Sequence, residues 1–144
     1  MPRFVPGNYV MNGQAASHNP VDNTIVYIGP FVAAAGTTEG FRIGTFPRAG
    51  IIRRIDFNLI VTVVASGGED TTLSLRINAA TPTGGQLTTT LEHNANGIQN
   101  AFPGLAIPVA IGDEYEFELD YPLNFTTQPT GVLYSWSISV ETPG

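Results

Sequence analysis

The fold class of this chain is decided by residues 51–64, Ile51-Ile52-Arg53-Arg54-Ile55-Asp56-Phe57-Asn58-Leu59-Ile60-Val61-Thr62-Val63-Val64. Apolar and polar side chains alternate along this stretch, which is the pattern of a β-strand with one buried face. The residues predicted to point inward are Ile51, Ile55, Phe57, Leu59, Val61 and Val63. Arg53 falls in the same register, and Arg54 is predicted on the opposite face. The stretch therefore predicts a long core strand with one charged residue out of place.

Comparable short runs recur along the rest of the chain, separated by glycine, proline and asparagine. The predicted strands are Thr24–Ile28, Gly40–Phe46 (with Phe41, Ile43 and Thr45 inward), Leu73–Ile77, Gln86–Glu92, Ala106–Ile111, Glu114–Tyr121 and Val132–Glu141, the last with Trp136 in the core. A turn at residues 66–70 predicts that the strands before and after it form a hairpin. No segment has helical periodicity. About eight strands of this kind predict an all-β fold, an antiparallel jelly-roll-like β-sandwich.

Residues 1–22 differ from residues 23–144, which hold the predicted sandwich domain. Proline and glycine interrupt every window of the first segment, so we predict an extended N-terminal arm. The arm nevertheless carries apolar side chains that a solvated tail does not need, namely Phe4, Val5, Tyr9, Val10 and Met11. Two alternatives stay open: the arm folds over its own domain, or it docks on a neighbouring subunit.

Composition excludes several classes of protein. The chain has 144 residues and no cysteine, which fits one domain without disulfides, thiolate metal sites or a cysteine nucleophile. Its net charge of −6 argues against a nucleic-acid partner, because phosphate binding needs a basic surface. No apolar run reaches the roughly 18 residues of a membrane helix, and the first residues lack the apolar stretch of a signal peptide. Only 12% of residues are charged, so the surface suits contact with protein or sugar.

An acidic segment is the first candidate for chemistry. Five of the twelve carboxylates are Asp113, Glu114, Glu116, Glu118 and Asp120, and alternation places the last four on one strand face. Neighbours on such a face lie about 6.6–6.8 Å apart, too far for two adjacent residues alone to hold one Ca²⁺. Three interpretations stay open: a solvated face, salt bridges to arginines of a neighbouring subunit, and a cation or glycosidase site.

The other polar candidates also have more than one interpretation. Arg53 and Arg54 sit at the rim of the sandwich or form an ion pair between subunits. His18 and His93 belong to no metal-ligand or catalytic motif, and residues 93–96 form either a simple turn or a sugar-binding loop. The sequence contains no serine elbow and no phosphate-binding loop. We therefore predict no catalytic residues, no metal, no cofactor and no enzyme activity.

Three segments carry a resemblance. They are Phe46-Pro47-Arg48-Ala49-Gly50 before the strand at 51–64, Leu105–Asp113 before the strand at 114–121, and the closing aromatic strand Val132–Val140. This order resembles the jelly-roll domains related to tumour necrosis factor and C1q heads, as they occur in tailed-phage structural proteins. The likeness covers roughly residues 39–142 and carries no functional residue over. It implies a domain that assembles as a trimer or dimer and acts by binding.

The resemblance implies one of two phage roles, a capsid decoration protein or a tail-fibre or receptor-binding head, and the N-terminal arm favours the decoration protein. A capsid decoration (cement) protein is small and uses a terminal arm to clasp capsid subunits, which places it on the virion surface. Its partners are then the major capsid protein and copies of itself, most simply as a homotrimer, with no nucleic acid and no membrane. The residues expected to bind the partner are Phe4, Tyr9, Val10, Met11, Arg53 and Arg54.

The alternative is a tail-fibre, receptor-binding or lectin-like carbohydrate-binding domain. Its glycan would bind at residues 93–100 and 125–131, and an exposed Phe102 or Phe125 would favour it.

Overall fold

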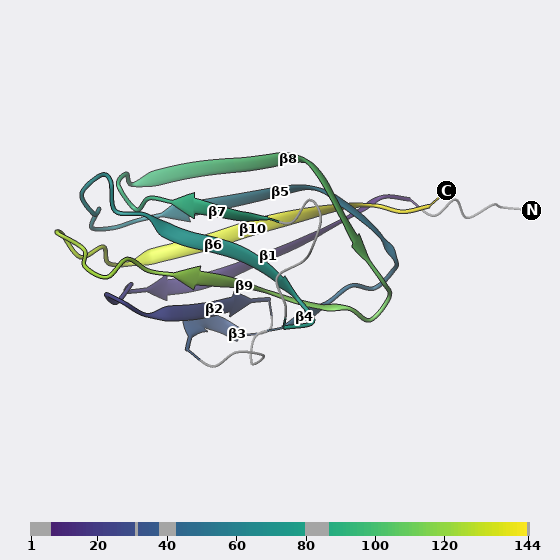
Figure 1. Cartoon of the computed structure of the whole chain (residues 1–144), viewed down its shortest axis with the longest axis horizontal. Helices are drawn as coiled ribbons and strands as arrows, with labels where there is room; N and C mark the ends of the chain where they lie inside the picture. Colours follow the sequence, from purple (N-terminus) through teal and green to yellow (C-terminus); the bar gives the residue numbers. More distant parts are fainter. Residues whose placement is uncertain (1–6, 31, 38–42, 80–86, 144) are drawn as a thin grey trace, which may run out of the picture.

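The computed structural model describes residues 7–30, 32–37, 43–79 and 87–143, which form ten β-strands and no helix. The predicted all-β fold is therefore confirmed (Figure 1). The strands are β1 Tyr9–His18, β2 Ile25–Gly29, β3 Val32–Gly36, β4 Gly44–Thr45, β5 Gly50–Ile60, β6 Thr71–Ile77, β7 Thr88–Leu91, β8 Gly97–Val109, β9 Glu114–Asp120 and β10 Val132–Glu141. Within these residues, no helix is long and apolar enough to cross a membrane.

The strands form two antiparallel sheets that face each other. One has four strands in the order β1-β10-β5-β8, and the other has the order β3-β2-β9-β6-β7, with β4 also paired to β9. The pairs β1/β10, β2/β9, β5/β8 and β6/β7 alternate between the two sheets, and each pair lies inside the previous one along the chain. This nesting of early and late strands is the jelly-roll arrangement.

The core lies between the sheets and is built mainly from the alternating strands β9 and β10. Their inward side chains are all at most 3% exposed: Tyr115, Phe117, Leu119, Val132, Tyr134, Trp136, Ile138 and Val140. Phe57 of β5 lies at the centre, with its ring centroid 5.1 Å from that of Phe117 and 5.9 Å from that of Tyr134. The prediction that Trp136 belongs to the core is confirmed.

A β-bulge at Arg53 corrects the predicted register at the start of β5. Arg54 lies opposite Ser139 and Ile52 opposite Val140, so Arg53 is the extra residue of β5. Beyond the bulge the predicted inward residues Ile55, Phe57, Leu59 and Val61 are buried, but before it Ile52 is buried in place of Ile51. The bulge removes the apparent conflict, because Arg53 and Arg54 are both exposed instead of pointing to opposite faces. Val63, predicted inward, is 46% exposed in the connection after β5, where the strand alternation does not continue.

The predicted hairpin between the strands around residues 66–70 is wrong. β5 pairs with β10 and β8, whereas β6 pairs with β9 and β7 in the other sheet. The connection 61–70 crosses from one sheet to the other. Both strands point their apolar faces at the same core, and alternation alone does not show which sheet a strand joins.

Other strand predictions differ in extent. β8 begins at Gly97 instead of Ala106, and β3 has no predicted counterpart. In the segment before β5, Thr45 was predicted to point inward. Instead Thr45 is exposed and the next residue, Phe46, is fully buried, so the register is shifted by one position. Phe41 lies outside the described residues.

Residues 9–18 of the predicted arm form β1, an edge strand that pairs with β10 of the same chain. For these residues the first alternative therefore holds: they fold onto their own domain. β1 alternates, with Tyr9, Met11, Gly13 and Ala15 toward the core and Val10, Asn12 and Gln14 outward. Two of the inward residues are a glycine and an alanine, so the sequence shows little hydrophobic alternation.

Candidate functional site

The residues predicted to bind the partner, as far as the structure describes them, lie at one end of the sandwich. We call this the terminus end, because β1 begins and β10 ends there (Figure 1). The start of β1 is held by Arg48, whose backbone oxygen accepts a hydrogen bond of 2.7 Å from the Tyr9 hydroxyl. The Arg48 guanidinium lies 5.1 Å from the Tyr9 ring centroid and donates to the Gly7 oxygen at 3.1 Å. Thr142 also donates to the Gly7 oxygen, at 2.8 Å.

The bulge in β5 presents Arg53 and Arg54 on the outer face of the four-stranded sheet. Arg53 Nε donates to Glu141 Oε2 at 2.9 Å, and both side chains are about half exposed, 46% and 53%. This geometry agrees with the rim interpretation, with the carboxylate supplied by the same chain. Water screens such an exposed pair, so it contributes little to folding and its charges stay accessible to a partner.

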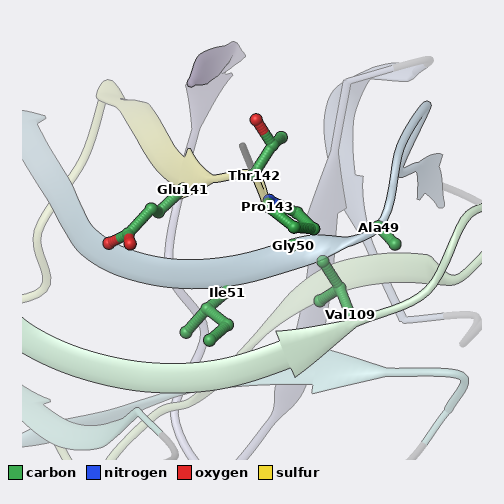
Figure 2. Close-up of a pocket in the computed structure, with 7 residues that line it drawn as sticks. All are labelled: Ala49, Gly50, Ile51, Val109, Glu141, Thr142 and Pro143. Carbon is green, nitrogen blue, oxygen red and sulfur yellow. The ribbon is translucent and has the colours of Figure 1, made fainter. Parts of the chain in front are cut away.

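Two shallow grooves flank this ion pair. The first, of about 370 Å³, lies between β1, β10 and β5 and is lined by Asn8, Tyr9, Val10, Arg53, Ser139, Val140 and Glu141. The second, of about 310 Å³, lies on the other side of Glu141 and is lined by Ala49, Gly50, Ile51, Val109, Glu141, Thr142 and Pro143 (Figure 2). Figure 2 shows Ile51 on β5 and Val109 on β8, with Glu141 and Pro143 at the end of β10. The site is therefore a grooved surface with one ion pair at its centre.

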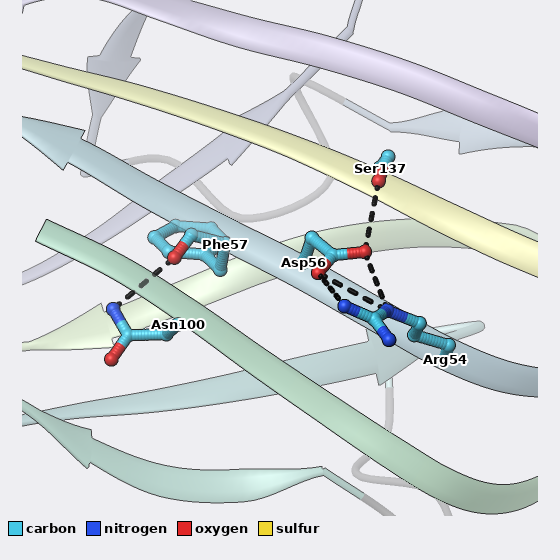
Figure 3. Close-up of polar contacts among 5 residues, drawn as sticks. All are labelled: Arg54, Asp56, Phe57, Asn100 and Ser137. Carbon is cyan, nitrogen blue, oxygen red and sulfur yellow. Dashed lines mark hydrogen bonds and ion pairs between the residues drawn. The ribbon is translucent and has the colours of Figure 1, made fainter.

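A second ion pair continues the site along β5. Arg54 donates from Nε and Nη2 to the Asp56 carboxylate at 2.9–3.2 Å, and the Ser137 hydroxyl donates to Asp56 Oδ2 at 3.4 Å (Figure 3). The hydrogen bond from Arg54 holds the pKa of Asp56 below its usual value, so this carboxylate is charged at neutral pH. In the same view, the Asn100 side chain donates to the Phe57 backbone oxygen at 3.2 Å and ties β8 to β5.

The predicted partner-binding residues do not all face outward. Val10 is 57% exposed, and Arg53 and Arg54 are exposed with it on the outer face. Tyr9 and Met11 are partly buried and pack against the core, so most of their surface serves the fold. Phe4 lies outside the described residues. Val10 and Arg53 were predicted from separate segments of the sequence, and the strand pairing brings them to the same groove.

The acidic segment is not a uniform solvated face. Glu114, Glu116, Glu118 and Asp120 do share the outer face of β9, but only Glu114 and Asp120 are exposed. Glu116 is 2% exposed, and Glu118 Oε2 accepts a hydrogen bond of 2.6 Å from Arg76 of the same chain. Asp113 accepts from the Ala110 N–H, which lowers its pKa and closes the turn before β9. Among the described residues, no three His, Cys, Asp or Glu side chains are placed to share a metal ion.

The two histidines, which belong to no recognisable motif, both lie at the opposite end of the sandwich, and each ring centroid is 5.9 Å from that of Tyr121. His93 is fully buried, with Nε2 2.8 Å from the Tyr134 hydroxyl, which itself lies 2.8 Å from the Tyr121 hydroxyl. Burial, with the nearby His18 as a smaller cause, lowers the pKa of His93 to about 4. The His18 ring stacks on Tyr121 at 5.9 Å between centroids.

This buried network was not predicted from the sequence, because its residues lie far apart in the chain. His18 belongs to β1 and Tyr134 to β10, whereas His93 and Tyr121 belong to connections. Their aromatic character and inward register were the only available signals.

The feature that would favour a carbohydrate-binding domain is weak in the part of the chain that the structure describes. Phe125 is buried against His93 and Tyr121, and Phe102 is half-buried and packs against the core. Neither ring offers an open stacking platform for a sugar.

Comparison with known proteins gives little further guidance. No protein-family model matches this chain, and no curated protein matches it. Among solved structures it is similar to FlhE, with 10% identity and a TM-score of 0.48 over 94% of this chain and 99% of that chain. It is also similar to dimeric latent PorU from Porphyromonas gingivalis, with 10% identity and a TM-score of 0.45 over 94% of this chain and 13% of that chain.

Proposed function

We propose that this protein is a non-enzymatic virion structural protein, a capsid decoration protein that binds the outer surface of a tailed-phage capsid and stabilises it. The observation that carries the proposal is the groove at the terminus end, where Val10 and Arg53 lie together beside Glu141. An exposed apolar side chain next to an accessible ion pair suits contact with a folded protein surface. The jelly-roll strand order is also the fold that the sequence resemblance implies.

In this function the protein acts mechanically. Bound copies, as a homotrimer or dimer, hold adjacent copies of the major capsid protein together and favour the assembled shell by mass action. Residues 9–18 do not serve as a free clasp, because they pair with β10. The contact is instead assigned to the outward side of β1 and to the neighbouring arginines of β5.

The first test is the copy number of this protein relative to the major shell protein in purified particles, measured by quantitative mass spectrometry. A simple fraction of the shell protein supports the decoration function. A handful of copies per particle overturns it in favour of a tail component. Absence from any particle removes both viral functions and leaves the lectin-like alternative.

The second test is the rebinding of purified protein to particles stripped of it. Val10→Asp places a charge in the groove and is expected to weaken rebinding about tenfold, as loss of an anchor contact does. The matched control is Ile111→Asp, since Ile111 is 73% exposed at the same end but does not line the groove. Equal effects of the two variants would contradict the assignment of the groove.

A further inference from the structure

The end of the sandwich opposite the termini carries its own candidate surface. We call it the loop end; it consists of the connections 19–24, 61–70, 92–96 and 121–131 and the strand residues next to them (Figure 1). All of these connections lie within the described part of the chain. None of them lines the grooves around Arg53 and Glu141.

Exposed apolar side chains concentrate at the loop end. Of the seven large hydrophobic residues that are exposed among the described residues, five lie there: Val21 (56%), Ile25 (42%), Ile60 (59%), Val63 (46%) and Leu123 (71%). Val21 and Leu123 belong to connections that are joined by a hydrogen bond from the Asn23 N–H to the Pro122 oxygen at 2.8 Å. Single exposed hydrophobic residues are ordinary, but the concentration of five of them at one end singles that end out as a candidate for partner contact.

The charge of the loop end identifies the kind of partner. Five carboxylates lie there, Asp22, Glu69, Asp70, Glu92 and Asp120, and no arginine occurs in any of the four connections. The other described residues include four arginines and six carboxylates, a net charge of −2, against −5 at the loop end. Most of the net negative charge of the described residues is therefore at this end.

The carboxylates are fixed by neutral groups, which leaves their charge uncompensated. Asp22 Oδ1 accepts from the Phe125 N–H at 2.9 Å, Glu69 Oε2 from the Thr126 N–H at 2.6 Å, and Glu92 Oε1 from the Gly68 N–H at 2.8 Å. These bonds orient the carboxylates but add no positive charge. A cationic partner would meet charges already held in place.

Hydrogen bonds tie the connections of the loop end to one another. Val63 and Thr130 exchange backbone hydrogen bonds at 3.1–3.2 Å, and the Ala65 N–H donates to the His93 oxygen at 2.7 Å. The Gly131 N–H donates to Asn19 Oδ1 at 2.9 Å. A surface ordered in advance loses less conformational entropy on binding, so modest contacts give useful affinity.

We propose that the loop end is a docking surface for a protein partner whose own surface carries arginine or lysine among apolar side chains. Nucleic acid and anionic membranes have the wrong sign of charge. A second copy docked loop end to loop end brings five carboxylates against five, which is repulsive. The inference does not depend on the capsid function, because the two surfaces are at opposite ends of the molecule.

The test uses synthetic peptides and the full chain, followed residue by residue by ¹⁵N NMR. A peptide of alternating arginine and leucine is expected to bind saturably and to shift signals of residues 19–24, 61–70 and 121–131. Raising the ionic strength from about 0.05 M to about 0.5 M weakens this binding, since screening shortens the reach of the charges. Matched peptides with serine for leucine or glutamate for arginine are expected to bind at least about tenfold more weakly.

Variants locate the binding surface. The double variant Val21→Ser, Leu123→Ser is expected to weaken binding of the arginine–leucine peptide about tenfold. The double variant Asp70→Asn, Asp120→Asn replaces two exposed carboxylates and is expected to weaken binding by a similar factor. Ile111→Ser, at the terminus end, is the control and should leave the affinity unchanged. No saturable binding, equal binding of the serine or glutamate peptide, or signal shifts confined to the terminus end would each overturn the proposal.

Discussion

The two ends of this sandwich are made from the same strands but are held together in different ways. The terminus end has surface ion pairs, Arg53–Glu141 and Arg54–Asp56, around shallow grooves. The loop end has backbone cross-links above the buried network of His93, Tyr134 and Tyr121. Buried hydrogen bonds are costly to break and surface ion pairs are not. The comparison indicates that stability resides more in the groups behind the loop end, whereas the charges of the terminus end are available for binding.

The largest expected effect comes from pH acting on His93. Its pKa is about 4 in the folded protein against 6.5 as the ordinary value, mainly because of burial. As pH falls below about 6.5, the unfolded state takes up a proton that folded His93 does not, so stability is lost between pH 6.5 and 4. The loss reaches about 3 kcal/mol at the lower limit. Urea unfolding followed by Trp136 fluorescence at several pH values measures it.

The control for this prediction separates the two histidines, because burial also lowers the pKa of His18. His93→Gln keeps an amide donor and acceptor near Thr71 and Tyr134 but cannot titrate, so most of the pH slope should disappear. His18→Gln should remove a smaller part. An unchanged slope in His93→Gln would contradict the role of this buried network at the loop end.

The next largest effect tests how β1 is attached to the domain. A Cβ atom added at Gly13 would lie 2.5 Å from Cε2 of Trp136, which is 3% exposed and cannot move away. Gly13→Ala is therefore expected to lower the free energy of unfolding by about 2–3 kcal/mol, as overpacking of a core does. Gly97→Ala is the control, since its Cβ meets nothing within 4 Å. Urea unfolding compares the variants, and equal losses would show that close packing on Trp136 is not the cause.

A smaller effect is expected when single hydroxyl groups are removed from the buried network behind the loop end. The Tyr134 hydroxyl lies between His93 and Tyr121, so Tyr134→Phe leaves two buried polar partners unsatisfied. We expect a loss of about 2 kcal/mol. Tyr121→Phe removes only one hydrogen bond of the chain and should cost about half as much. Thermal or urea unfolding measures both, and a larger loss in Tyr121→Phe would reverse the inferred order.

The smallest effect belongs to the terminus end. Arg53→Gln breaks the exposed ion pair with Glu141 and is expected to cost less than about 1 kcal/mol, with little left at high salt. Arg48→Gln should cost more, because Arg48 holds both the Tyr9 ring and the Gly7 oxygen. A large loss in Arg53→Gln would mean that this ion pair serves stability more than binding.

Sequence reasoning succeeded where burial on one face produces regular alternation. The inward and outward sides of β9 and β10 follow directly from their residues, because both strands lie in the middle of a sheet and bury one full face. It failed for β1, whose inward positions include Gly13 and Ala15. There the large side chain that fills the space, Trp136, belongs to the neighbouring strand. Packing complementarity between distant residues leaves no local pattern.

The candidate sites show the same division. The residue types alone set the chemistry of the surface: arginine occurs without lysine, no cysteine occurs, and the carboxylates concentrate in particular segments. The pairing of distant strands, in contrast, places Arg53 in a bulge beside Val10 and Glu141 and buries His93 against Tyr134. Residue type fixes charge and hydrogen-bonding capacity locally, whereas strand order and register fix which of these groups meet. Strand order depends on a core shared by residues far apart in the chain, so it emerges only when the whole sandwich closes.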